Sequence, residues 1–191
     1  MQVRQAIGER RSIRKFKSIP VQRELVEQVV LAGTLAPSGK NKQPWHLTIL
    51  QGQAKDDLVA VLEESIQQLK QQNVSTGSSE WSAQVMRQAP VCIVIHNPYF
   101  TPTEDHNGFK RYMSLVDTQS IGAAIQNMLL RAHELGLGSL WICDVFYGEQ
   151  AINELLGRSD ELVAAVSLGF ADETPAARPR KSLPELSTWL G

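Results

Sequence analysis

Residues 123–142, AAIQNMLLRAHELGLGSLWI, contain the end of a helix, a turn and the start of a strand. The apolar pattern before the turn reaches back to Ser114 and leaves little polar face, which predicts a central helix over 114–135. Gly136 suits its C-cap, because glycine adopts a left-handed conformation without strain. The β-branched and aromatic run SLWICDVF, 139–146, predicts a strand. The stretch therefore predicts a helix at the centre of the fold that leads directly into the sheet.

The GLGS segment at 136–139 has the spacing of a dinucleotide-binding fingerprint, but not its position. In such a fingerprint the glycines connect a strand to a helix, so that the helix N-terminus faces the phosphates. Here the glycines connect a helix to a strand. A C-cap and a tight turn explain them, and we do not expect a dinucleotide to bind there.

Outward from this stretch, the remaining sequence alternates helical and strand patterns. Four strands and long crossovers argue against a regular doubly wound sheet. They favour an α+β fold with three layers, α/β/α, in which helices cover both faces of a small sheet. The chain shows no internal repeat or interdomain linker, so we expect one domain over 1–191. The further helices are predicted at 2–9, 22–35, 53–71, 80–88 and 148–156, and the further strands at 45–50, 91–96 and 161–170.

Composition excludes several classes of function. Hydrophobic residues make up 42% and charged residues 20%, as in ordinary globular proteins, and the net charge of −1 favours neither nucleic acid nor an anionic membrane. No apolar run has the length of a membrane helix. The first sixteen residues are too polar for a signal peptide, and we expect a cytoplasmic protein. Cys92 and Cys143 lie in apolar runs without redox or metal spacing, which predicts buried, reduced thiols.

Side-chain catalysis and metal binding receive no support from the sequence. There is no G-x-S-x-G elbow and no H-E-x-x-H motif. The four histidines are scattered, and each is more simply read as a structural or surface residue than as a base. The acidic pairs on the helix at 53–71 fit a solvated face. We therefore expect no catalytic side chain and no metal ligand.

Two basic clusters lie near opposite ends of the chain: Arg10, Arg11, Arg14 and Lys15, and then Arg178, Arg180 and Lys181. Arginine recognises phosphate in a planar, bidentate way. The clusters are either two halves of one anion site or two unrelated surface patches, and charge alone does not decide between them.

Two turn-rich segments also stand out. APSGKNKQPW, residues 36–45, collects turn-forming residues just before a strand, and is either a connector or a cradle for a ligand. NPYFTPTEDHNGFK, residues 97–110, is predicted as an irregular loop that is long for a compact domain, and is therefore either functional or mobile.

Four segments together resemble the FMN-dependent nitroreductase family: RRSIRKF, APSGKNKQPW, AAIQNMLLRAHELGLGSLWI and SLGFADETPAARPRK. They occur in the family's order and spacing over nearly the whole chain, whose length is that of the small members. The resemblance implies a mostly antiparallel sheet and an intertwined homodimer with FMN at the interface. It also implies that the arm at 171–191 packs on the partner subunit.

The resemblance assigns the cofactor contacts residue by residue. The first motif and the C-terminal arginines would hold the FMN phosphate, ribityl chain and ring edge. The turn after residue 36 would reach the flavin of the other subunit, and the end of the third strand would pass over the isoalloxazine. The asparagine and lysine with which some larger members contact the pyrimidine have no clear equivalents in 78–90. The assigned residues are Arg10, Arg11, Ser12, Arg14, Pro37, Ser38, Gly39, Asn41, Trp141, Ile142, Cys143, Arg178 and Arg180.

The implied activity is an FMN-dependent oxidoreductase with NAD(P)H as electron donor. FMN would take a hydride and pass it to a nitroaromatic, a quinone or an activated alkene, so that the flavin carries the chemistry. Two alternatives stay open. One is other flavin chemistry in the same family, such as reductive dehalogenation or flavin cleavage, and the other is a flavin-binding protein without turnover.

Overall fold

The sheet of this computed structural model, which describes residues 1–100 and 108–191, has four strands in the order β1-β2-β4-β3. All three pairings are antiparallel. The central strand β2 is buried along its whole length, because its apolar residues face helices on both sides. The strands are β1 (His46–Gln51), β2 (Val91–Asn97), β3 (Gly138–Ile142) and β4 (Glu161–Gly169).

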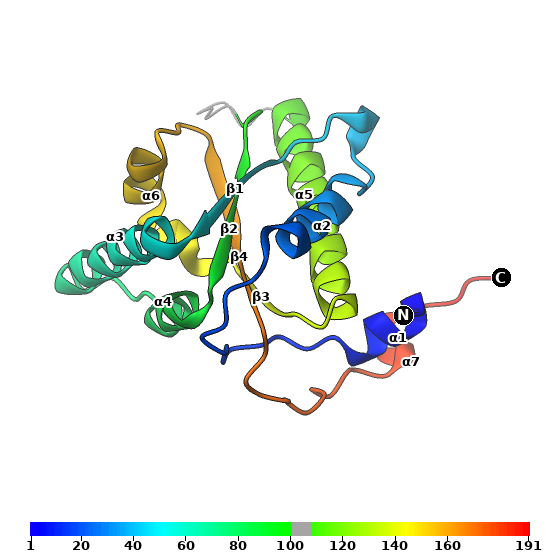
Figure 1. Ribbon diagram of the computed structural model, residues 1–191. Coiled ribbons are helices and arrows are strands. Elements are labelled where there is room, and N and C mark those ends of the chain that lie inside the picture. The colour runs from blue at the N-terminus through cyan, green and yellow to red at the C-terminus, as the bar shows by residue number, and fades with distance from the viewer. Residues whose placement is uncertain (101–107) are drawn as a thin grey trace.

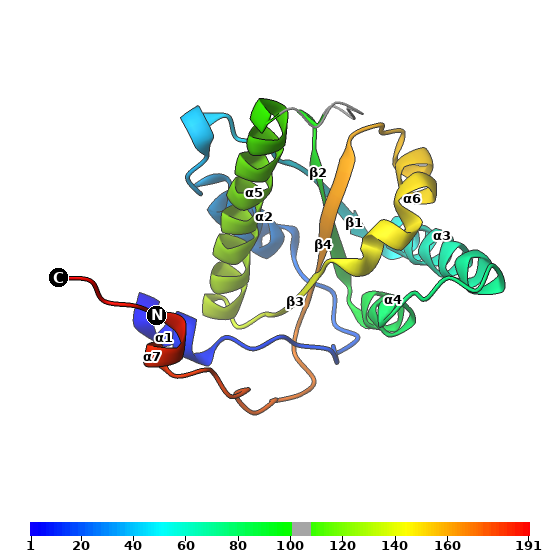
Figure 2. The same cartoon turned by 180° about the vertical axis from the view of Figure 1, so that it is seen from behind.

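Helices cover both faces of this sheet, which confirms the three-layer α+β prediction (Figure 1). On one face lie α2 (Arg23–Thr34) and α5 (Gly108–Glu134). On the other lie α3 (Gly52–Gln71), α4 (Ser79–Gln88) and α6 (Glu149–Leu156), which are clearest from behind (Figure 2). Each face has its own apolar core. The shorter elements are α1 (Val3–Glu9), η1 (Gly39–Asn41), η2 (Asp144–Gly148) and α7 (Leu183–Leu186).

The helix α5 spans the molecule beside the sheet. It buries Ile121, Ile125 and Met128 against the sheet and α2. The two helices approach so closely that a Cβ on Gly33 would lie 2.8 Å from Met128 Cγ. As predicted, Gly136 ends the helix in a left-handed conformation, with φ +75°. Its 27 residues correspond to a length of about 40 Å.

Two predicted boundaries were wrong. The third strand ends at Ile142 instead of Phe146, because the chain turns into the short helix η2. The segment at 97–110 is not all loop: Asn97 ends β2, and α5 already begins at Gly108. Of the predicted loop, residues 101–107 lie outside the described part of the chain.

The two cysteines differ in environment. Cys92 is fully buried in β2, as predicted, and burial raises its pKa to about 12. Cys143 is exposed, so the prediction of a buried thiol was wrong for this residue. The cause is the end of β3 at Ile142, after which the chain leaves the sheet. Burial of part of the side chain and the neighbouring Asp144 still raise the Cys143 pKa.

Candidate cofactor site

Backbone contacts fix the N-terminal arginine segment against the sheet. Ile13 N–H donates to Ser139 O over 3.0 Å, and Lys17 N–H donates to Phe170 O over 2.9 Å. This extended segment therefore runs between the start of β3 and the end of β4. The burial of Ile13 and Phe16 anchors it in the core, while the polar residues between them stay near the surface.

The N-terminal arginine segment also forms hydrogen bonds with the residues that follow β4. Asp172 N–H donates to Lys15 O over 2.9 Å, and the Glu173 carboxylate accepts hydrogen bonds from the backbone N–H groups of Arg14 and Lys15. These contacts lead the C-terminal residues back along the N-terminal segment. The two basic clusters, about 165 positions apart in sequence, thereby become neighbours.

Together they line one cavity of about 290 Å³. Five of its lining residues are arginines, and the described lining contains no carboxylate. The structure therefore places the two clusters together, in the lining of one cavity. Lys15 and Lys181 belong to the same sequence clusters but do not line this arginine cavity. Its lining residues are Ile7, Gly8, Arg10, Arg11, Ser12, Arg14, Pro175, Ala176, Ala177, Arg178 and Arg180.

The electrostatics of the arginine cavity favour an anion. The pKa of Arg10 is lowered, first by burial and then by the positive charges of Arg11 and Arg180. The Nε of Arg14 is buried and has no hydrogen-bond partner in the described part of the chain. Arg11 differs, because its guanidinium turns back to donate to the carbonyls of Gly8 and Arg10. Several positive charges, with no carboxylate in the described lining, favour the binding of an external anion.

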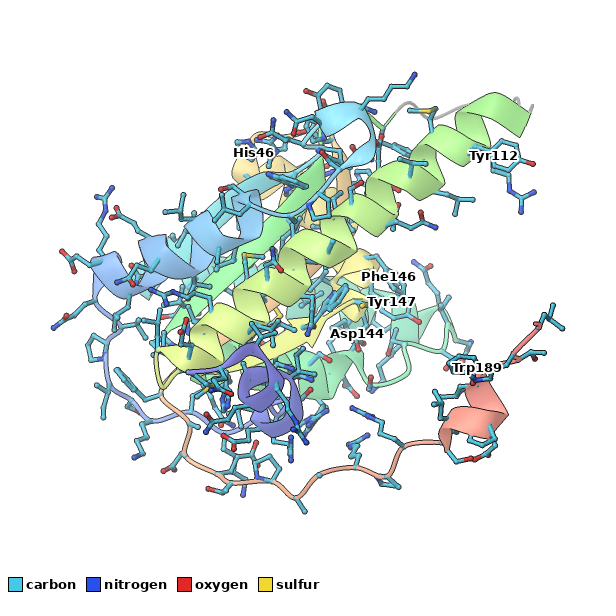
Figure 3. The ribbon with its side chains drawn as sticks, turned by 90° about the vertical axis from the view of Figure 1, so that its right-hand side faces the viewer. His46, Tyr112, Asp144, Phe146, Tyr147 and Trp189 are labelled. Carbon is cyan, nitrogen blue, oxygen red and sulfur yellow. The ribbon has the colours of Figure 1, made fainter. Side chains whose placement is uncertain are left out.

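From this cavity the site continues over α4. The guanidinium carbon of Arg14 lies 5.1 Å from the ring centroid of Trp81, within the range of a cation–π contact. The same turn of α4 also binds η2, since Ser78 and Ser82 both donate to the Asp144 carboxylate over 2.9 Å. Figure 3 shows Asp144 on η2 beside Phe146 and Tyr147.

Trp81, Ser82 and Asp144 belong to this region but were not predicted from the sequence. Trp81 and Ser82 lie on a correctly predicted helix, but no spacing rule connects them to the arginines. Asp144 was placed inside a predicted strand. Only the tertiary contact between α4 and η2 identifies the group.

The three residues assigned at the end of β3 have different surroundings. Trp141 is 38% exposed and packs near Gly122 of α5, where an added Cβ would lie 3.5 Å from the indole. Ile142 is buried in the core on the opposite face. Cys143 is exposed beyond the strand. Ile142 can therefore serve a ligand only through its backbone, whereas Trp141 and Cys143 also offer their side chains.

The turn at 37–41 does not meet the arginine cavity within one chain. Gly39 packs on Val116 and Ser120 of α5, whereas Arg10 and Arg11 line an adjoining cavity with His133 near the other end of that helix. At 1.5 Å per residue, these positions on α5 are about 20–25 Å apart. Figure 1 shows the same separation: η1 and α1 lie at opposite ends of α5.

Comparison with known proteins identifies the class. The family model for the nitroreductase family matches residues 7–170, and the chain belongs to this family. It is 27% identical over 182 residues to the "Putative NADH dehydrogenase/NAD(P)H nitroreductase" of Methanothermobacter thermautotrophicus, covering 93% of this chain and 82% of that protein.

Two solved structures are similar over the whole chain. The crystal structure of a "putative nitroreductase in complex with FMN" from Desulfovibrio desulfuricans has a TM-score of 0.77 and 27% identity, covering 100% of this chain and 98% of that one. A BluB-like flavoprotein from Clostridium difficile 630 has a TM-score of 0.80 and 25% identity, covering 100% of both chains.

Two further observations concern metal-ligand clusters and membrane-spanning helices. No group of three or more potential metal ligands occurs in the part of the chain that the structure describes. Within that same part, none of the helices combines the length and the apolar character needed to cross a membrane.

Proposed function

We propose that this protein is an FMN-dependent oxidoreductase that takes electrons from NAD(P)H and passes them to nitroaromatics, quinones or activated alkenes. The arginine cavity carries the proposal, because its five arginines, with no carboxylate among the lining residues that the structure describes, fit a terminal phosphate. The names of similar proteins support the same activity and cofactor. One relative is named a "Putative NADH dehydrogenase/NAD(P)H nitroreductase", and one similar solved structure is a complex with FMN.

The residues present fit FMN in both position and charge. Arg10, Arg178 and Arg180 offer the cationic end, and Ser12 adds a hydroxyl for the phosphate or ribityl chain. Arg14 reaches from this cavity toward Trp81, which places its positive charge beside the expected position of the ring edge. When bound, FMN supplies the redox chemistry. The protein orients it, and the positive charge of Arg14 favours the reduced, anionic form.

We infer that two copies of the chain build each site. The face of α5 that points away from the sheet carries exposed Tyr112 and Leu115 and the small residue Ala123, so it suits close packing on a second helix. A two-fold axis that sets two α5 helices antiparallel brings the 37–41 turn of one chain to the partner's arginine cavity. Pro37, Ser38, Gly39 and Asn41 then complete a site that one chain leaves open.

The rest of the assignment follows this arrangement. The chain is one domain over 1–191, and its arm at 171–191 packs on the partner subunit after passing the arginine cavity. Backbone at Trp141, Ile142 and Cys143 borders the flavin ring. The protein works in the cytoplasm as a homodimer on small-molecule acceptors, without nucleic acid or membrane.

The test combines the cofactor with turnover. The purified protein is incubated with FMN and with FAD, desalted, and heated to release the bound flavin for chromatography. We expect FMN in stoichiometric amount and no FAD. Steady-state oxidation of NADH or NADPH by a quinone should then depend on the bound FMN. Bound FMN without turnover would indicate a flavin-binding protein, and failure to bind FMN would refute the proposal.

A further inference from the structure

We propose that Lys42 and Asp117 form a latch that fixes the turn at residues 38–43 in the conformation required by the cofactor site of the partner subunit. The proposal rests on the proposed function, since it gives this turn its role. Lys42 and Asp117 would be positioning residues: they hold the turn in place and leave contact with the flavin to its neighbours.

The turn has an unfavourable backbone. Lys40, Asn41 and Gln43 have φ angles of 53°, 54° and 52°. This left-handed region is unfavourable for residues other than glycine, although asparagine tolerates it better than lysine or glutamine. Three such residues within four positions persist only when surrounding contacts determine the conformation. The turn therefore needs a strong anchor to the body of the protein.

Hydrogen bonds within the turn shape it but do not attach it. Asn41 N–H donates to Ser38 O over 3.0 Å, and Gln43 N–H donates to Ser38 Oγ over 2.9 Å. The contacts between Gly39 and α5 are close packing and one long hydrogen bond. A Cβ there would lie 2.4 Å from Val116 Cγ1, and the bond from Gly39 N–H to Ser120 Oγ is long at 3.4 Å. Close packing locates the turn on α5, but these contacts alone hold it weakly.

The ion pair between Lys42 and Asp117 supplies the anchor. Lys42 Nζ lies 2.5 Å from Asp117 Oδ2, and the Asp117 side chain is only 4% exposed. The ammonium also lies 4.5 Å from the ring centroid of Tyr99. Because Asp117 Oδ1 is buried without a partner among the described residues, Lys42 is the main compensation for this carboxylate. Loss of Lys42 would leave a buried charge unpaired, which is strongly unfavourable.

One side chain of the turn differs from its neighbours in direction. Lys42 points to the body, while its neighbours Lys40, Asn41 and Gln43 are exposed. Asn41 is among the residues that the proposed site requires to face the partner. The latch thus holds Lys42 on α5 and thereby directs the neighbouring Asn41 toward the partner subunit. In this way α5 of one chain contributes to cofactor binding in the other chain.

The experiment uses Lys42→Met, with Lys42→Arg as the conservative variant and Lys40→Met as the matched control. Lys40 lies in the same turn but is exposed and makes no ion pair within the described residues. FMN affinity is measured by fluorescence titration, dimer content by light scattering, and order of the turn by hydrogen exchange of peptides that cover 36–45.

We expect Lys42→Met to weaken FMN binding at least tenfold and to accelerate exchange in 36–45, while Lys42→Arg and Lys40→Met stay within threefold of the unaltered protein. Asp117→Asn, which removes the charge with little change in shape, should behave like Lys42→Met and guards against misfolding of a single variant. Equal affinity and exchange in Lys42→Met and Lys40→Met would overturn the latch. If the unaltered protein bound no FMN, the proposed function would fail, and the exchange data would still decide whether the ion pair orders the turn.

Discussion

The guanidinium of Arg14 stacks over the ring of Trp81 at 5.1 Å, which joins the N-terminal arginine segment to α4. This contact determines where the cation lies along the proposed flavin site. A cation–π contact contributes about 0.5–2 kcal/mol, depending on its exposure.

Trp81→Leu removes the aromatic face and should weaken FMN binding by about 2- to 30-fold, because Arg14 loses its orientation. Trp81→Phe keeps an aromatic ring and should retain most of the affinity. Fluorescence titration of apoprotein with FMN measures both. Unchanged affinity in Trp81→Leu would show that Arg14 does not depend on the stack.

A second prediction separates cavity charges from surface charges. Arg180 lines the arginine cavity and contributes to the lowered pKa of Arg10, whereas Lys15 lies outside it and is exposed. Loss of a charge-assisted phosphate contact costs about 1.5–3 kcal/mol, or about 10- to 150-fold in affinity. Arg180→Ala should weaken FMN binding by this factor and Lys15→Ala should not. Equal dissociation constants for the two variants would contradict the assignment.

Protein stability should depend on Glu161 in a defined pH direction. Burial, followed by the charges of Glu149 and Asp117, raises the pKa of Glu161 in the folded state. A carboxyl with a raised folded pKa contributes stability below its unfolded pKa of about 4.5, and this contribution is lost as pH rises through the folded value.

Glu161→Gln keeps an oxygen for the bond from Asn97 Nδ2 and removes the titration. The unaltered protein should therefore lose stability relative to this variant over the pH range that begins near 4.5 and extends upward through the raised folded pKa of Glu161. Urea unfolding at several pH values measures the difference. A constant difference across that range would show that burial does not disfavour the Glu161 charge.

The C-terminal arm gives a fourth prediction. Leu183, Leu186, Trp189 and Leu190 are 65%, 65%, 86% and 94% exposed, and α7 and Trp189 lie outside the packed layers (Figure 3). Apolar side chains in this state fit a surface on the partner. Deletion of 182–191 should loosen the dimer and lower FMN content together, although no assigned flavin contact is removed. Light scattering and absorbance at the flavin band test this. A truncated protein that remains dimeric and fully loaded would contradict the packing of the arm on the partner.

The sequence predicted those parts of the fold that depend on local pattern. The apolar helix before Gly136 and the buried strand at 91–96 carry periodicity and β-branched residues, which act within a few positions. The end of β3 escaped prediction because VFY at 145–147 looks strand-like, while the Ser78 and Ser82 bonds to Asp144 come from another helix. Local pattern contains no information about such a contact.

In the candidate site, too, local sequence predicted some features, while others depend on tertiary contacts. Arginine chemistry suggested an anion, and the family resemblance supplied the roles of Arg10 and Arg180. Both clusters line one cavity because residues 10–17 pair with Ser139 of β3 and with Ala171 just after β4, and only the folded chain establishes this pairing. Trp81 was invisible to sequence reasoning, because its partner Arg14 lies 67 positions away.

The most direct test of the central claim is a complementation experiment on the shared site. Arg180→Ala damages the cavity, and Asn41→Ala damages the turn that we place in the partner's site. Each homodimer alone should bind FMN weakly. Heterodimers, purified through two different tags, then contain one site with both defects and one site with none. The account predicts one FMN per heterodimer, bound with the affinity of the unaltered protein. If each site were built from a single chain, every site would carry one defect, and the absence of any tight-binding site in the heterodimer would contradict the account.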